Sequence, residues 1–198
     1  MNFRHFALCV TVCILSITHV QAARTNDNIM GTDRITVDQL SEFLIRNNPT
    51  IGRDHARRIA QLYDVECRAE GVRTIVAFAQ MCHETGFLRF GNDVRPEQNN
   101  FCGFGAIGGG ARGNYFPTMN AGIRAHVQHL KAYASRRKIN QPCIDSRRKL
   151  IQLGSAKKVG KLSGRWAADM DYGKKILAIM QQIQAMDYKS FPAKKISQ

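Results

Sequence analysis

One carboxylate, Glu84, stands where an apolar segment ends and a glycine-bearing loop begins. Residues 75–82 before it contain a single strongly polar side chain, Gln80, and the aromatic residues Phe87 and Phe90 follow it. Burial disfavours the charged form of a carboxyl group and raises its pKa toward neutral pH. A carboxyl that is still protonated at the working pH can donate a proton to a leaving oxygen, as the acid of a glycosidase does. The sequence therefore predicts a general acid at Glu84.

Two other interpretations of this carboxylate follow from its neighbours. A carboxylate at a helix end often pairs with an arginine, and Arg73 and Arg89 are both close in the sequence. A zinc-protease motif begun by His83 and Glu84 is excluded, because that motif requires a histidine where this chain has Phe87. Pairing with arginine is the alternative that stays open beside catalysis.

Two further histidines, His126 and His129, are three residues apart on a predicted helix. Such a pair can share a metal ion, but no cysteine or carboxylate accompanies it in the sequence. We therefore interpret both as surface histidines and expect neither a metal site nor a cofactor.

Helical periodicity places Glu84 at the end of a central helix. The predicted helices span about residues 36–48, 54–70, 74–83, 118–135 and 146–153, with a last one from about 172. Thr36 begins the first, with Gln39 completing a capping box, and Gly71 ends the second. The segment 74–83 is apolar on all sides, so we expect it at the centre of the domain.

Seven of the sixteen glycines fall between residues 90 and 117, where no helical period survives. This composition predicts a loop or a short β-hairpin. The fold class that follows is mainly α, with a helical core and a small β-hairpin or loop lobe. Glu84 lies where the core and the lobe meet, and such a junction forms a cleft.

Residues 1–22 have the pattern of a secretory signal peptide, with cleavage after Ala22. A lipid anchor on Cys9 or Cys13 is the alternative, but neither lies late enough behind the apolar run. No other stretch reaches the length of a transmembrane helix. We expect a secreted or periplasmic protein, with a flexible leader over 23–35, one domain over 36–188 and a basic tail over 189–198.

The whole chain of 198 residues carries a formal net charge of +14, so its surface should attract polyanions. For an exported protein, anionic cell-wall polymers are the expected partners. The basic clusters lack interleaved aromatic residues, so we expect no specific nucleic-acid binding. We also expect a monomer.

Four cysteines follow the predicted signal peptide: Cys67, Cys82, Cys102 and Cys143. An oxidising compartment permits disulfides, and four cysteines allow three pairings among which the sequence does not choose. Cys82 lies within a predicted helix and not at a helix N-terminus, which favours a structural role over a nucleophilic one.

Several segments around Glu84 and downstream of it resemble one enzyme family. The matching segments, in order, are residues 79–87 (AQMCHETGF), 99–105 (NNFCGFG), 116–118 (FPT), 122–126 (GIRAH) and 164–176 (GRWAADMDYGKKI). Together they are similar to glycoside hydrolase family 73, the bacterial peptidoglycan glucosaminidases. The resemblance implies a lysozyme-like fold and hydrolysis of the β-1,4 bond after N-acetylglucosamine in peptidoglycan glycan strands.

The resemblance also implies roles for individual residues. Glu84 would be the general acid, and Asn100, Phe101 and Gly103 would shape the floor of the cleft. Trp166 would stack on a sugar, although a core position is equally compatible with its sequence. Tyr172 would hydrogen-bond the substrate or hold the last helix, and we favour the substrate.

The chain departs from the family pattern in its second catalytic group. Some family members have a second catalytic glutamate in the lobe, yet this chain has no acidic residue between Glu97 and Asp145. Either Asp93 or Glu97 serves as base, or the 2-acetamido group of the substrate attacks directly. We favour substrate assistance slightly, with Asp93 as the best protein candidate.

Two other classes of function are compatible with the sequence. A muramidase or lytic transglycosylase of the same superfamily would also use one acid but would cut the other glycosidic bond. A catalytically silent, basic wall-binding module or a nucleic-acid binder is the alternative without catalysis.

Overall fold

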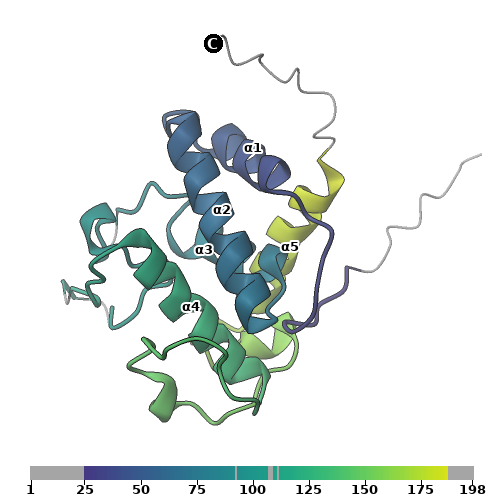
Figure 1. Ribbon diagram of the computed structural model, residues 1–198, viewed down its shortest axis with the longest axis vertical. Helices are drawn as coiled ribbons and strands as arrows, with labels where there is room; N and C mark the ends of the chain where they lie inside the picture. The colour runs from purple at the N-terminus through teal and green to yellow at the C-terminus, as the bar shows by residue number, and fades with distance from the viewer. Residues whose placement is uncertain (1–24, 92, 107–108, 111, 187–198) are drawn as a thin grey trace, which may run out of the picture.

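A helix that is buried on every side, α3 (Thr74–Glu84), runs through the middle of the molecule (Figure 1). Its residues from Thr74 to Cys82 are all buried, as the apolar sequence predicts. The computed structural model describes residues 25–91, 93–106, 109–110 and 112–186. The mainly helical fold predicted from the sequence is confirmed.

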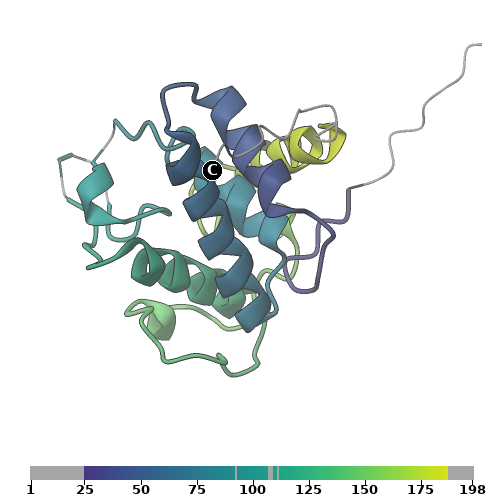
Figure 2. The same ribbon diagram turned by 45° about the horizontal axis from the view of Figure 1, so that its top comes forward.

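Four more α-helices pack around α3: α1 (Val37–Asn47), α2 (Arg53–Glu70), α4 (Met119–Ala134) and α5 (Tyr172–Ala185). In the view of Figure 2, α1 and α5 lie on one side of α3 and α4 lies on the other. Helix α2 contacts α1, α3 and α4, and α5 contacts α3 and α1. The helices thus enclose one apolar core, with α3 at its centre.

The helix boundaries follow local capping chemistry. Thr36 caps α1 by accepting a hydrogen bond from the backbone N–H of Gln39, but the predicted capping box is only half formed. The side chain of Gln39 instead donates to the carbonyl of Ile183 in α5, at 2.8 Å. Gly71 ends α2 in the left-handed region with φ of 70°, as expected. The predicted helix over 146–153 is reduced to one 3₁₀ turn, η2 (Arg148–Leu150).

Two other 3₁₀ turns, η1 (Pro96–Gln98) and η3 (Val159–Leu162), lie in the connections. The glycine-rich segment from 90 to 117 forms no strand over its described residues, so the β-hairpin alternative is wrong and the loop alternative holds. Side-chain amides replace a strand ladder there. Asn100 alone bonds the N–H and the carbonyl of Phe104 and the carbonyl of Asn114.

The described part of the leader packs on the domain. Ile29 is fully buried, and antiparallel bridges join Asn28 to Lys158 and Met30 to Val72. The structure differs here from the expected flexible leader, because the buried side chains of Ile29 and Ile35 and these backbone pairs attach the segment. The predicted signal peptide, its cleavage site, the lipid-anchor alternative and the basic tail lie outside the described residues.

The described part of the chain also shows the state of the cysteines and the character of the helices. All four cysteines considered above are free thiols, with Cys67, Cys82 and Cys102 buried and Cys143 exposed. None of the helices described there combines the length and the apolar character that crossing a membrane requires.

Candidate active site

Glu84 is the last residue of α3, and an unusual turn follows it. Gly86, Phe87 and Leu88 all have positive φ, between 56° and 61°. The N–H of Phe87 returns to the carbonyl of Cys82 at 2.8 Å, which closes the helix end. The helical backbone pattern therefore ends directly after Glu84.

Buried polar groups hold this turn in place. Thr85 donates to the carbonyl of Met81 at 2.8 Å and accepts from the N–H of Leu88 at 2.9 Å. Asn48, from the end of α1, donates to the carbonyl of Phe87 at 2.9 Å. A left-handed conformation costs a residue other than glycine roughly 1–2 kcal/mol. Such strain persists where the surroundings determine the conformation, and it is concentrated at functional sites.

The carboxyl group of Glu84 is held by two donors on the same oxygen. Trp166 Nε1 donates to Oε1 at 3.0 Å, and the hydroxyl of Tyr172 also donates to Oε1. Neither arginine that the sequence offered as a partner is bonded to it: Arg73 and Arg89 both donate to backbone carbonyls. The alternative of a helix-end ion pair for Glu84 is therefore wrong.

Burial raises the pKa of the Glu84 carboxyl above its ordinary value, and the hydrogen bonds from Tyr172 and Trp166 offset only part of that rise. The direction agrees with the prediction from its apolar surroundings. Among the described residues no group is bonded to Oε2, and this oxygen is not sealed from solvent. The carboxyl thus has one fixed oxygen and one accessible oxygen.

Glu84 lines a cavity of about 660 Å³. The wall also includes Asp93, Asn100 and Gly103 from the glycine-rich loop and Trp166 from the connection before α5. A larger hollow, of about 810 Å³, is lined by three cationic side chains and no carboxylate, so it offers no acid for catalysis. In the cavity at Glu84, by contrast, a carboxyl group with a raised pKa borders open space, which is a typical arrangement of a ligand site.

Residues 60–185 match the model of the glucosaminidase family, described as mannosyl-glycoprotein endo-beta-N-acetylglucosaminidase. The chain belongs to this family. The predicted membership is confirmed, and the chain is accordingly a glycoside hydrolase of the endo-β-N-acetylglucosaminidase class.

The proteins that this glucosaminidase resembles include a bacterial relative and a solved structure. An uncharacterized protein of Borreliella burgdorferi is 35% identical over 166 residues, which cover 84% of this chain and 81% of the relative. A crystal structure of autolysin E of S. aureus, in complex with the muropeptide NAM-L-Ala-D-iGlu, has a TM-score of 0.50. Its sequence is 14% identical, and the match covers 79% of this chain and 70% of that one. At this identity the likeness concerns the fold alone.

In this glucosaminidase, two of the three residues predicted for the cleft floor line the cavity and the third does not. Gly103 lies against the acid, and its φ of 71° is one that few other residues adopt. Asn100 lines the cavity but is fully buried, with its amide bonded to the surrounding loop. Phe101 is outside the cavity wall and packs into the helical core.

The two predicted aromatic residues both donate to Glu84 but differ in their access to the cavity. Trp166 is half-buried: its ring packs near His129 and Tyr133, and it also lines the cavity. The two alternatives for Trp166 are therefore both met in part. Tyr172 is 2% exposed, and its hydroxyl contacts Glu84 and Gln80 instead of the open cavity.

The two carboxylates considered as bases differ in their access to the cavity. Asp93 lines the cavity and accepts from the N–H of Gly110 at 3.2 Å. Glu97 is exposed in η1 and is outside the cavity wall. Of the two, only Asp93 lies on the described wall of the cavity that Glu84 also lines.

Sequence reasoning missed a polar chain behind the acid. His126 is fully buried, so the expectation of a surface histidine is wrong, and its ring nitrogens are bonded to Tyr63 and Gln80. His129 is also buried and bonds Asp145 at 2.9 Å. The available signal was Gln80 itself, because a lone amide in an apolar helix needs a buried partner.

Proposed function

We propose that this glucosaminidase hydrolyses peptidoglycan at the β-1,4 bond after N-acetylglucosamine, with Glu84 as the general acid. One observation carries the proposal: a carboxyl with a raised pKa has one oxygen fixed by two donors and the other accessible from an open cavity. The family membership supports the reaction class, and the motifs shared with peptidoglycan glucosaminidases support the substrate.

In the proposed reaction, Glu84 gives its proton to the glycosidic oxygen as the bond to the anomeric carbon breaks. The carboxylate that forms keeps the hydrogen bonds from Trp166 and Tyr172, which stabilise its negative charge. The 2-acetamido oxygen of the same sugar attacks the anomeric carbon and forms a cyclic intermediate. Water then opens this ring and returns a proton to Glu84, so that the net reaction consumes one water molecule.

The test of this proposal is the variant Glu84→Gln, which keeps the size of the side chain and removes the acidic proton. We expect wall clearing to be lost, while the circular dichroism spectrum and binding to purified sacculi stay unchanged. Clearing by this variant would remove Glu84 from the mechanism, and loss of both activities together would indicate misfolding.

The position of the cut is tested separately, by mass spectrometry of sacculi digested with the unmodified enzyme. We expect products with N-acetylglucosamine at the reducing end. Products with muramic acid at that end would favour the muramidase alternative, and anhydro products would favour a lytic transglycosylase. Failure to release any product would favour the silent wall-binding module.

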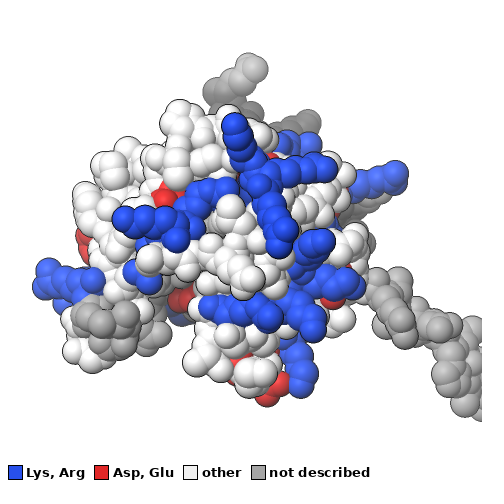
Figure 3. All heavy atoms as spheres, turned by 90° about the horizontal axis from the view of Figure 1, so that it is seen from below, with Lys and Arg blue, Asp and Glu red and all other residues white. Residues whose placement is uncertain are grey.

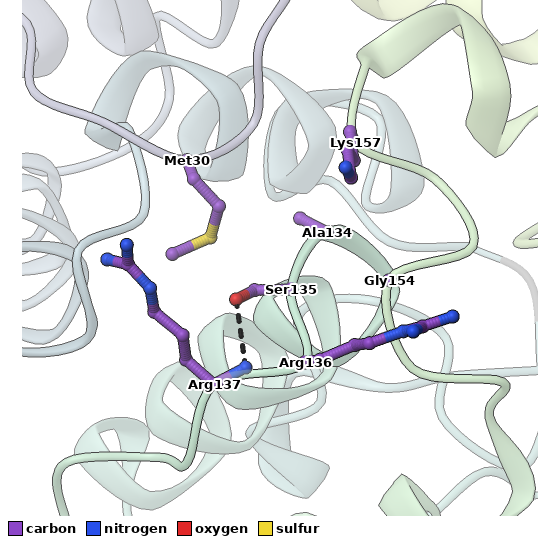
Figure 4. A pocket seen from close by; sticks show the side chains of 7 residues that line it. All are labelled: Met30, Ala134, Ser135, Arg136, Arg137, Gly154 and Lys157. Carbon is purple, nitrogen blue, oxygen red and sulfur yellow. Dashed lines mark hydrogen bonds between the residues drawn. The ribbon is translucent and has the colours of Figure 1, made fainter.

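We further propose that anionic cell-wall polymers bind the basic surface. Figure 3 shows many Lys and Arg side chains and few carboxylates across one face. Close up, Arg137 and Lys157 lie on opposite sides of the larger hollow, with Met30 and Ala134 between them, and Arg136 extends past Gly154 (Figure 4).

These three cations are exposed and bond to no carboxylate in the described structure. We expect the double variant Arg137→Gln/Lys157→Gln to release the protein from sacculi at lower salt than the unmodified protein. The control is Lys174→Gln/Lys175→Gln, which removes two cations that already pair with Asp171 and Asp169. Equal release by both variants would indicate that net charge alone holds the protein to the wall.

The proposed site of action requires export, for which we propose cleavage after Ala22. The supporting feature is the apolar run of residues 6–17 behind Arg4 and His5. Expression of the full chain, followed by N-terminal sequencing of the extracytoplasmic protein, should give a sequence that begins at Ala23. An intact N-terminus would contradict the proposal.

A further inference from the structure

A continuous chain of hydrogen bonds leads from the interior to the proposed acid. Tyr63 in α2 lies 2.9 Å from Nδ1 of His126 in α4, and Nε2 of His126 lies 3.0 Å from Oε1 of Gln80 in α3. Gln80 Nε2 donates to the hydroxyl of Tyr172 in α5 at 2.8 Å, and that hydroxyl donates to Glu84. Four helices thus contribute one member or more to a single chain.

The direction in which these hydrogen bonds are donated is set at the buried end of the hydrogen-bond chain, at Tyr63. The side chain of Tyr63 is fully buried, and the only partner of its hydroxyl among the described residues is Nδ1 of His126. A buried hydroxyl hydrogen needs an acceptor, so Tyr63 donates and Nδ1 carries no hydrogen. Burial lowers the pKa of His126 to about 3, which keeps the ring neutral. Its one ring hydrogen is therefore on Nε2 and points to Gln80.

The position of the hydrogen on His126 determines which groups donate in the remaining bonds, as far as the Glu84 carboxyl. Gln80 accepts with its oxygen and must turn its NH₂ group to Tyr172. The oxygen of Tyr172 accepts that bond, which leaves its single hydrogen for Oε1 of Glu84. Trp166 Nε1 can only donate, and it donates to the same oxygen. With two donors on Oε1, the proton of the neutral carboxyl is left to Oε2.

We propose that Tyr63, His126 and Gln80 are positioning residues that place the acidic proton on the cavity-facing oxygen of Glu84. The inference rests on the proposed function, because it assigns this proton to the general acid. The reverse direction would have the opposite effect: Nδ1 of His126 would carry the hydrogen, and Gln80 would present its oxygen to Tyr172. Tyr172 would then donate to Gln80, and Oε1 could hold the proton away from the substrate.

The direction can be measured without any reaction. Two-bond ¹H–¹⁵N correlation spectra distinguish a protonated ring nitrogen from an unprotonated one, and the assigned signals of His126 in the unmodified protein report its tautomer. We expect the hydrogen on Nε2 at neutral pH. A hydrogen on Nδ1 would overturn the inference, whatever the outcome for Glu84→Gln. Conversely, wall clearing by Glu84→Gln would refute the proposed function while leaving the tautomer unchanged.

Gln80→Glu tests the effect on catalysis with almost no change in shape. A carboxylate at this position has no N–H to donate, so Tyr172 turns its hydrogen to it and leaves Glu84. We expect the rate of product release to fall by about tenfold or more, because the carboxylate of Glu84 that forms in the reaction loses one stabilising hydrogen bond. Binding to sacculi should not change.

The matched control is Gln39→Glu, which also places a carboxylate at a buried glutamine. Gln39 is 6% exposed and donates to the carbonyl of Ile183, away from Glu84. The rate of product release by Gln39→Glu should stay within about twofold of that of the unmodified protein, when measured below the unfolding temperature of the variant. Equal losses in both variants would indicate a general effect of buried charge and would overturn the inference.

Tyr63→Phe keeps the inference testable if neither glutamate variant folds. It removes only the hydroxyl and retains the edge-on contact of the ring with Phe78. We expect His126 to lose its single tautomer and product release to slow by a few fold, with sacculus binding unchanged. An unaltered tautomer together with an unaltered rate would remove Tyr63 from the chain.

Discussion

A Cβ atom on Gly103 would lie 3.4 Å from Oε2 of Glu84, the carboxyl oxygen for which the described residues provide no donor. The backbone of the glycine-rich loop thus passes directly beside the oxygen that we expect to carry the proton. The φ of 71° at Gly103 is also one that a residue with a side chain adopts only with strain. Two separate effects follow from placing a side chain there.

Gly103→Ala should lower both stability and activity. The positive φ costs alanine roughly 1–2 kcal/mol, which a thermal or urea unfolding curve measures. The added methyl group also covers Oε2, so we expect a fall of at least about tenfold in product release, the equivalent of 1.4 kcal/mol in the barrier.

Gly71→Ala separates these two effects. Gly71 has a φ of 70°, but a Cβ there would meet only the end of the Met30 side chain, at 3.8 Å. This variant should lose a similar amount of stability and keep its activity. If both variants keep full activity, the approach of the loop to Glu84 has no role in the reaction.

Asp93→Asn tests whether the protein supplies the second catalytic group. Among the described loop residues, Asp93 alone places a carboxylate on the cavity wall, but under substrate assistance the acetamido group of the substrate is the second catalytic group. We therefore expect Asp93→Asn to lose far less activity than Glu84→Gln, with Glu97→Gln as the exposed control. A variant at Asp93 as inactive as Glu84→Gln would favour a protein base instead.

Trp166→Phe should shift the pH dependence of the reaction upward. The general acid works in its protonated form, so the rate falls as the pH rises through the pKa of Glu84. The hydrogen bond from Trp166 stabilises the carboxylate and lowers this pKa. Its removal raises the pKa further and moves the alkaline limb of the pH–rate profile to higher pH.

The maximal rate of Trp166→Phe should fall at the same time, because the indole N–H no longer stabilises the carboxylate that forms. Trp166 also packs against Tyr133, and phenylalanine keeps an aromatic ring there. A limb that stays in place or moves to lower pH would contradict the assignment of that limb to Glu84.

The sequence predicted those features that depend on local pattern. The apolar run of residues 75–82 fixed both the central place of α3 and the raised pKa at its end. The loop before Phe116 and the polar chain behind Glu84 depend instead on contacts between distant segments. Gln80 and His126 are 46 residues apart, and periodicity gives no sign that they meet. Tyr172 was expected at the substrate because a sequence does not reveal which way a hydroxyl points.

Lys131 and Glu70 form a buried ion pair whose disruption should be costly. Their charged groups lie 2.7 Å apart, with side chains 3% and 0% exposed. Burial alone would raise the pKa of Glu70, but the hydrogen bonds from Lys131 and from the N–H groups of Asn140 and Gln141 lower it below its ordinary value. Glu70 thus connects α2, α4 and the segment that follows α4.

Lys131→Met removes the cation and leaves a buried carboxylate, which should reduce the free energy of unfolding by about 3–5 kcal/mol. Adding Glu70→Gln should restore part of the loss, because the remaining group is uncharged. The lowered pKa of Glu70 also sets the sign of the pH dependence of stability. The contribution of Glu70 to the free energy of unfolding is fully present above the ordinary carboxyl pKa, and it is lost as the pH falls through the lowered pKa.

Urea unfolding of the unmodified protein should therefore show stability falling in acid, and Glu70→Gln should weaken that dependence. Product release by Lys131→Met, measured where the variant is still folded, should be close to that of the unmodified protein, because the pair lies outside the cavity of Glu84. A loss of less than about 1 kcal/mol would place the pair among exposed ion pairs, which contribute little.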